Sequence, residues 1–166
     1  MNEATPISGQ VQSSGTPVSA PLRLWAHDAE DLATFSSHLQ DALLVPGNAV
    51  WLPKQRRFAL ALSRLDWLVS RDGQWWRREA GLHFDHVLRV ERAGSGSPDS
   101  SMHLVDIKFA ATAAPSGLVR LSFADGQTIR LHVECLESCL RDLGDPELTS
   151  IVPTSPRLIP QDRFSK

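Results

Sequence analysis

The chain has 166 residues, 42% hydrophobic and 22% charged, which suits a single globular domain with a substantial core. A net charge of −2 gives no global excess that would indicate nucleic acid or a membrane surface, and no apolar run is long enough to span a bilayer. The N-terminus lacks the charged and apolar regions of a signal peptide, so we expect a cytoplasmic protein.

Composition divides the chain into three parts. Residues 1–20 are rich in Ser, Gly, Pro and Thr and predict a disordered tail, whereas residues 22–144 carry the periodic apolar patterns of a single α+β domain. Residues 145–166 are punctuated by proline and predict a largely irregular tail. The Ser/Gly-rich stretch 93–101 predicts a flexible loop within the domain.

Two helices are predicted, one near each end of the domain. The first follows a short strand at 22–27 and covers 28–44, with Asp28 as its N-cap and an apolar stripe that includes Leu32, Phe35 and Leu43. The second covers 134–144, because Leu136, Cys139, Leu140 and Leu143 have helical spacing and Gly144 can end it.

The remaining segments predict strands, mostly linked by hairpins. Segments 49–53 and 56–67 flank a turn at 53–55 after a break at Pro46–Asn48, and segments 81–92 and 104–111 follow. In the last hairpin, a three-residue loop ending at a left-handed Gly126 places Leu121 opposite Ile129 and keeps apolar residues on one face.

These elements predict an α+β fold: a bent antiparallel sheet or partly closed, PH-like barrel of about seven strands, with the second helix packed on it. The expected core residues are Phe58, Leu60, Leu62, Phe84, Leu88, Ile107, Phe109, Leu121, Ile129, Leu131 and Leu140.

Four blocks, "HLQDAL", "LPKQRRFALALSRLDW", "LHFDHVLRVERAG" and "IRLHVECLESCLRDLG", together resemble the bacterial domain-of-unknown-function 2948 family over Leu22 to Gly144. The resemblance implies no activity, because the family carries no established function.

The strand at 56–67 raises the first candidate site. Its inward face, Phe58, Leu60 and Leu62, continues into Arg64 and Asp66, so we expect the strand to switch faces at a bulge near Ser63 and to place that pair outside or at the rim. Together with Arg56 and Arg57, the pair could hold a carboxylate or phosphate. The alternative is a cross-turn ion pair of little energetic value.

A second candidate is the stretch Trp75, Trp76, Arg77 and Arg78, expected near a hairpin tip. Aromatics beside cations can bind a partner surface or stack on bases, but one tryptophan could instead close the end of the sheet. Residues 48–92 contain nine Lys or Arg against five Asp or Glu, leaving −6 for the rest. We therefore expect Arg56, Arg57, Arg77 and Arg78 to share a basic surface opposite the acidic helices.

Histidines and cysteines form three weaker constellations. His38 and Asp41 could make a general base but are more typical of a helix surface. His86 is expected to be a hydrogen-bonded interior residue, with His83 and Asp85 together on the other face. The third set, His132, Cys135 and Cys139, matches no closed zinc site, and the two thiols are expected to be unbridged packing residues.

No nucleophile elbow, metal signature or nucleotide-binding loop is present in the sequence. The leading hypothesis is a non-enzymatic binding or scaffold domain without cofactor or metal, using the basic Trp-bearing face for a protein or anionic partner. The alternatives are a small enzyme with an Arg/Asp/His pocket, and a domain that binds RNA or single-stranded nucleic acid; no membrane partner is expected.

Overall fold

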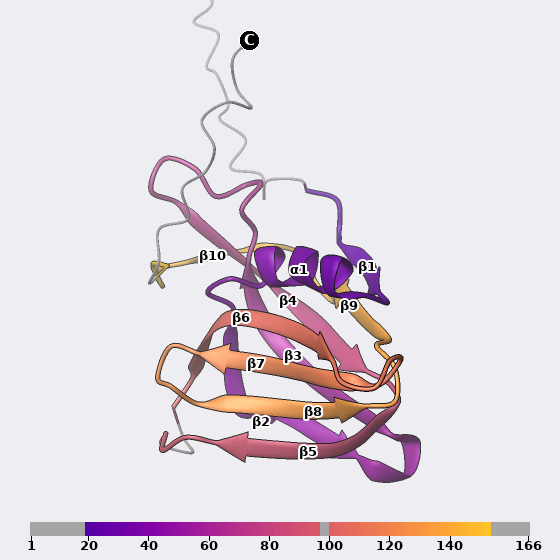
Figure 1. The fold of residues 1–166 in the computed structure, drawn as a ribbon. Coiled ribbons are helices and arrows are strands. Elements are labelled where there is room, and N and C mark those ends of the chain that lie inside the picture. The colour runs from indigo at the N-terminus through magenta and orange to yellow at the C-terminus, as the bar shows by residue number, and fades with distance from the viewer. Residues whose placement is uncertain (1–18, 97–99, 154–166) are drawn as a thin grey trace, which may run out of the picture.

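A computed structural model of the chain describes residues 19–96 and 100–153. Most of the tail predicted at 1–20 lies outside these residues. The described part contains one α-helix and ten strands, and the strands form a single antiparallel sheet (Figure 1). The elements are β1 (Arg23–Ala26), α1 (Ala29–His38), β2 (Leu43–Leu52), the 3₁₀ turn η1 (Pro53–Gln55), β3 (Arg57–Leu65), β4 (Trp75–Phe84), β5 (Val87–Ala93), β6 (Met102–Ala111), β7 (Gly117–Phe123), β8 (Thr128–Val133), β9 (Ser138–Asp142) and β10 (Glu147–Thr149).

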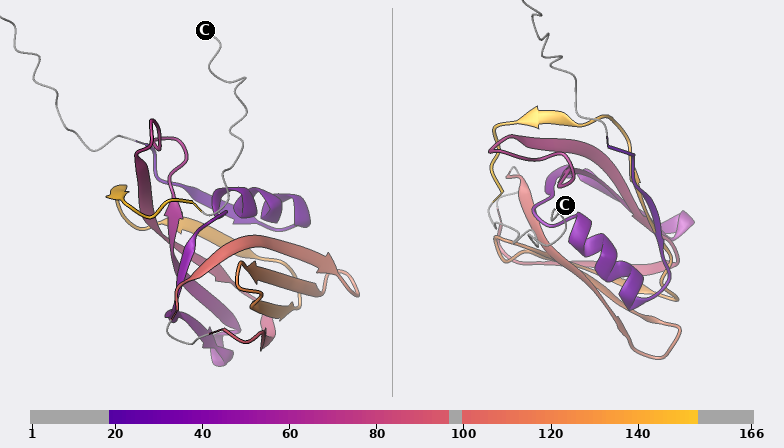
Figure 2. Two further views of the ribbon diagram at one scale, coloured as in Figure 1. Left: turned by 90° about the vertical axis from the view of Figure 1, so that its left-hand side faces the viewer. Right: turned by 90° about the horizontal axis from the view of Figure 1, so that it is seen from above.

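The strand order is β1-β9-β4-β3-β2-β6-β7-β8-β5, and β10 pairs with β4 beside β9. The sheet bends after β2, so that β6, β7, β8 and β5 form a layer in front of β3, β4 and β9, and α1 lies at the upper end between the layers (Figures 1 and 2). The sheet stays open, with β1 and β5 at the ends of this order, which agrees with the bent antiparallel sheet of the prediction and not with its barrel alternative, and it has ten strands where about seven were predicted. Within residues 19–96 and 100–153, no helix has the length and apolar composition needed to cross a membrane.

The first helix begins as predicted but is shorter. The Asp28 side chain accepts a hydrogen bond from the Asp31 backbone N–H at 2.8 Å, and Asp31 accepts one from the His27 N–H at 3.0 Å. These bonds satisfy two donors near the helix start. The helix ends at His38, and Leu43 begins β2 instead, so the predicted break at Pro46–Asn48 is a bulge inside a strand.

Nine of the eleven expected core residues are buried, Phe109 is partly buried, and Leu88 is 52% exposed. The last prediction is wrong because residues 81–92 form two strands. His86 adopts a left-handed φ of 56°, which turns the chain and shifts the alternation by one residue, so that Val87 is buried in place of Leu88.

The last hairpin has the predicted register. Leu121 lies opposite Ile129 and Val119 opposite Leu131, while Gly126 has a φ of 85°. The loop closes with a hydrogen bond from the Phe123 N–H to the Gln127 carbonyl at 3.0 Å. Because both strands keep their apolar residues on one face, the register is fixed by burial as well as by the turn.

The predicted C-terminal helix, and with it the PH-like arrangement, is wrong. Residues 138–142 form β9, which inserts between β1 and β4. The buried face of β9 holds Ser138, Leu140 and Asp142, and the two polar members bind groups from distant strands. Helical spacing misled the prediction because the strand's inward face is partly polar.

Candidate functional site

Arg64 continues the inward face of β3. The pairing of β3 with β4 runs without a bulge from Phe58 opposite Phe84 to Leu65 opposite Arg77, so the predicted switch of faces is wrong. Arg64 is 3% exposed, on the same face as Leu60 and Leu62. A charged side chain can lie there only if its charge and donors are met inside the protein.

Asp142 of β9 meets that requirement. Its two carboxylate oxygens accept hydrogen bonds from Nε and Nη2 of Arg64, both at 2.7 Å. The carboxylate also accepts the Leu22 backbone N–H at 2.7 Å. This is a bidentate ion pair with a backbone donor added, a strong geometry for a buried carboxylate.

Arg78 of β4 and Asp66 complete the network. Arg78 Nη2 lies 3.3 Å from Asp66 Oδ2 and donates to the Ser19 hydroxyl at 2.6 Å, while the same hydroxyl donates to Asp66. Arg78 Nε lies 3.7 Å from Asp142. Two arginines and two aspartates, all with side chains at most 4% exposed, form a neutral interior cluster. Arg64 and Asp66 therefore lie in the interior, where each charge has an oppositely charged partner.

The predicted basic surface is not formed. Arg56 pairs with Glu134 at 2.9 Å and Arg57 with Asp85 at 2.7 Å, both near η1, whereas Arg77 and Arg78 are buried on opposite faces of β4. The Asp85 carboxylate raises the pKa of Arg57. Neighbouring residues of a strand point to opposite faces, which separates the Arg77–Arg78 pair.

The two tryptophans lie in β4 and not at the loop tip. Trp75 and Trp76 are half-buried and pair with Thr149 and Leu148 of β10. The Trp75 ring packs edge-on against Trp67, with centroids 6.3 Å apart. The tip itself is formed by Asp72 and Gly73, both with positive φ.

The histidine and cysteine candidates do not converge. Asp41 follows the end of α1 with a φ of 61°, so it shares no helix face with His38. His83 and Asp85 share a face as predicted, at 3.4 Å. His86 is not interior: its side chain is 43% exposed and lies 2.7 Å from Glu137.

The third constellation, His132, Cys135 and Cys139, forms no group that could hold a metal ion within the described residues. His132 pairs with Glu91 at 2.9 Å. Both thiols are free, with Cys139 buried on β9 and Cys135 half-buried before it.

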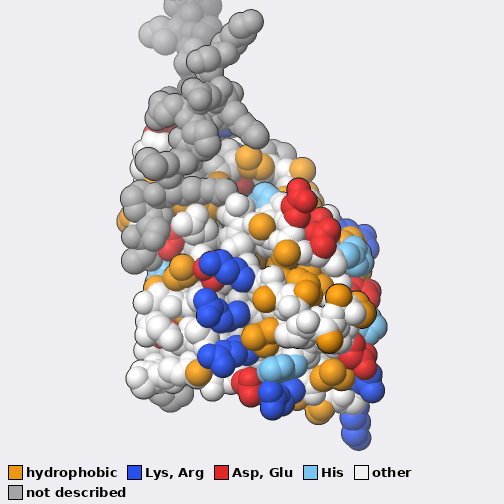
Figure 3. Space-filling view, in the orientation of Figure 1, with side chains coloured by type: hydrophobic (Ala, Val, Ile, Leu, Met, Phe, Trp, Pro, Cys, Tyr) orange, Lys and Arg blue, Asp and Glu red, His pale blue; other side chains and the backbone are white. Residues whose placement is uncertain are grey.

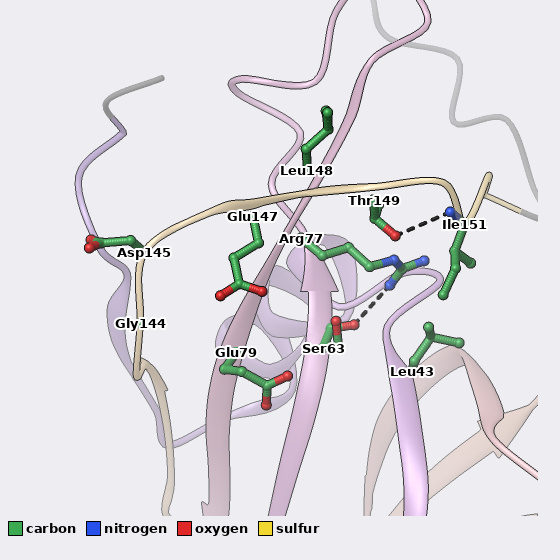
Figure 4. Close-up of a pocket in the computed structure, with 10 residues that line it drawn as sticks. All are labelled: Leu43, Ser63, Arg77, Glu79, Gly144, Asp145, Glu147, Leu148, Thr149 and Ile151. Carbon is green, nitrogen blue, oxygen red and sulfur yellow. Dashed lines mark hydrogen bonds between the residues drawn. The ribbon is translucent and has the colours of Figure 1, made fainter. Parts of the chain in front are cut away.

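Arg77 lies in a pocket on the outer face of β2, β3 and β4. The cavity measures about 370 Å³, and the C-terminal segment with β10 forms its other wall (Figure 4). Its lining residues are Leu43, Ser63, Arg77, Glu79, Gly144, Asp145, Glu147, Leu148, Thr149 and Ile151. In Figure 4 the guanidinium points toward Leu43 and Ile151, Glu79 and Glu147 face the cavity, and Asp145 points away.

One edge of the Arg77 guanidinium is satisfied and the other is not. Nη1 donates to the carbonyls of Ser63 at 2.9 Å and Asp41 at 3.2 Å. Nε and Nη2 have no hydrogen-bond partner among the described residues, although the residue is only 5% exposed. Burial lowers the pKa of Arg77, and the nearby Asp41 carboxylate opposes that shift.

The unsatisfied edge is the one that binds carboxylates elsewhere in this protein. Arg64 uses Nε and Nη2 to hold Asp142, and Arg57 uses the same two nitrogens to hold Asp85. Glu147 lies opposite Arg77 in the β4–β10 ladder, yet no ion pair joins them within the described residues. A buried, unpaired donor pair is rare in proteins, and a water, an ion or a ligand group can satisfy it.

Sequence reasoning selected Arg77 but missed Glu79, Glu147 and the network residue Asp142. The alternation of Arg77 and Glu79 around the inward Arg78 was the available signal for one pocket wall. Nothing local in the sequence places Glu147 beside them, because that contact depends on β10 pairing with β4.

The chain is similar to a protein family of unknown function. No curated protein and no solved structure is significantly similar to the chain. The family profile described as "Protein of unknown function (DUF2948)" matches residues 22–155, which include every strand of the sheet and α1. The chain therefore belongs to the DUF2948 family.

Proposed function

We propose that the protein is a non-enzymatic cytoplasmic binding domain whose pocket at Arg77 holds the carboxylate of a small zwitterionic ligand. The observation that carries the proposal is the buried Arg77 edge with two unsatisfied N–H donors. Leaving such donors without a partner costs about 1–3 kcal/mol, which a bound carboxylate would recover.

The acidic residues of the pocket narrow the ligand further. Glu79 and Glu147 face the same cavity and give it a net negative charge despite Arg77. A simple carboxylate would be repelled, whereas a ligand with a cationic group at its other end would be attracted. Arg77 and Glu79 lie two residues apart on one face of β4, a spacing of about 6.6 Å, which suits an ω-amino acid with several methylenes.

Binding is favoured over catalysis by the composition of the pocket. Among the described residues, its lining contains no histidine, cysteine or lysine, the usual groups for nucleophilic and acid–base chemistry near neutral pH. Arg64 and Asp66, the residues of the enzyme hypothesis, are paired with Asp142 and Arg78 in the interior cluster.

Calorimetry with 6-aminohexanoate tests the proposal, with hexanoate and hexylamine as matched probes that each lack one charge. We expect a dissociation constant near 1 mM, since a ligand of this size gains about 4 kcal/mol, and binding about tenfold weaker for each matched probe. Arg77→Met and Glu147→Gln should each weaken binding by a similar factor, and Asp145→Asn should not. Equal affinity for all three probes, or undiminished binding by Glu147→Gln, would refute the zwitterion site.

A further inference from the structure

The outer face of the other layer carries a cationic row. Lys108 of β6, Arg120 of β7 and Arg130 of β8 lie directly opposite one another in the two ladders, and all three are exposed. In Figure 3 the corresponding blue side chains follow one another down this face, across the strands labelled in Figure 1. We refer to Lys108, Arg120 and Arg130 as the cationic row.

Three cations placed opposite one another are expected to destabilise the sheet. Like charges directly opposite in an antiparallel ladder destabilise it, whereas opposite charges stabilise it. Lys108 lies 3.5 Å from Asp106, and Arg130 lies opposite Glu91 in the β5–β8 ladder without a direct ion pair, while Arg120 makes no ion pair with any described residue. At the far end of the row, Glu91 of β5 is held by His132 and Arg89.

We infer that the cationic row is a docking surface for an extended acidic segment of a partner protein. Charge complementarity requires an anion, and the arginine side chains can hold carboxylates through two nitrogens at once. This surface is separate from the Arg77 pocket, because the two lie on the outward faces of different layers.

Two features favour an acidic peptide over nucleic acid. Neighbouring strands lie about 4.8 Å apart, so the row spans about 10 Å; Glu91 of β5 continues it beyond Arg130, and Asp106 stands beside Lys108 on β6. A long polyanion would meet those acids. The outward positions flanking the row are Asp106, Ala110, Leu118, Ser122, Thr128 and His132; among these side chains only His132 carries a ring on which a base could stack, and that ring is held by Glu91.

The structure provides a matched control for this surface. Arg23 of β1 and Arg141 of β9 are also exposed and directly opposite each other, but they lie on the outer face of the other layer. The double variants Arg120→Gln/Arg130→Gln and Arg23→Gln/Arg141→Gln therefore remove the same charge from the same kind of position. Thermal unfolding should show both folded, since each substitution relieves a like-charge pair.

The test measures binding of a labelled peptide of about four residues with glutamate alternating with serine, which matches the length of the row, at about 0.05 M salt, where surface charges are weakly screened. We expect Arg120→Gln/Arg130→Gln to weaken binding about tenfold and the Arg23/Arg141 control by less than about twofold. A glutamine peptide should not bind. Equal losses in the two variants, no binding of the glutamate peptide by the wild type, or tighter binding of an oligouridylate of similar length would each overturn the inference.

Discussion

Asp142→Asn should be among the most damaging isosteric changes in this protein. The carboxylate accepts three hydrogen bonds at 2.7 Å, two from Arg64 and one from the Leu22 backbone, and lies 3.7 Å from Arg78. Asparagine keeps one acceptor oxygen, places an N–H₂ group against a guanidinium donor, and leaves two buried arginines with Asp66 alone. Removing one partner of a buried ion pair costs about 3–5 kcal/mol.

Urea unfolding followed by circular dichroism measures that cost. With an m-value of about 2 kcal/mol/M, the midpoint should fall by roughly 2 M without a change in slope. Asp145→Asn, three residues further on and exposed, is the control and should change the unfolding free energy by less than about 0.5 kcal/mol. A loss below about 1 kcal/mol for Asp142→Asn would show that the four charges do not act as one interior cluster.

Two further predictions concern the core and the thiols. Leu131→Ala should lower the unfolding free energy by about 2–5 kcal/mol, because Leu131 is fully buried, and a loss below about 0.5 kcal/mol would contradict its inward placement. Burial raises the thiol pKa of Cys135 and Cys139, so the thiolate fraction is small near neutral pH and reaction with a disulfide reagent should be slow and accelerate as pH rises toward the raised pKa. Rapid modification of both thiols at about pH 7 would contradict this.

Strands whose inward residues are all apolar were predictable from the sequence. The β7–β8 hairpin is the clearest case, because only one loop length keeps Leu121 and Ile129 on the same face. The helix start at Asp28 was equally predictable, since the capping interaction is local. In both cases the deciding interactions lie within a few residues of each other along the chain.

Strands with polar inward residues were not predictable in the same way. Arg64 and Asp142 are 78 positions apart, and each is acceptable inside the protein only because the other is there. Because the pairing could not be seen in the sequence, Arg64 suggested a change of face, and the segment that holds Asp142 was predicted to be a helix. The left-handed His86 was missed for a similar reason, since no glycine or proline marks the corner.

Arg77 and Arg78 are adjacent in β4, so their side chains point to opposite faces of the sheet and meet different surroundings. Arg78 points to the interior and finds two carboxylates and a hydroxyl, so its charge is compensated by the protein. Arg77 points to the outer face, where it donates to two carbonyls and lies near the Asp41 carboxylate, which opposes the lowering of its pKa by burial. If Arg77 served only the stability of the fold, an ion pair with Glu147 would be expected, because Glu147 lies directly opposite Arg77 in the β4–β10 ladder. The buried, unpaired edge of Arg77 is therefore the feature on which the proposed ligand site depends.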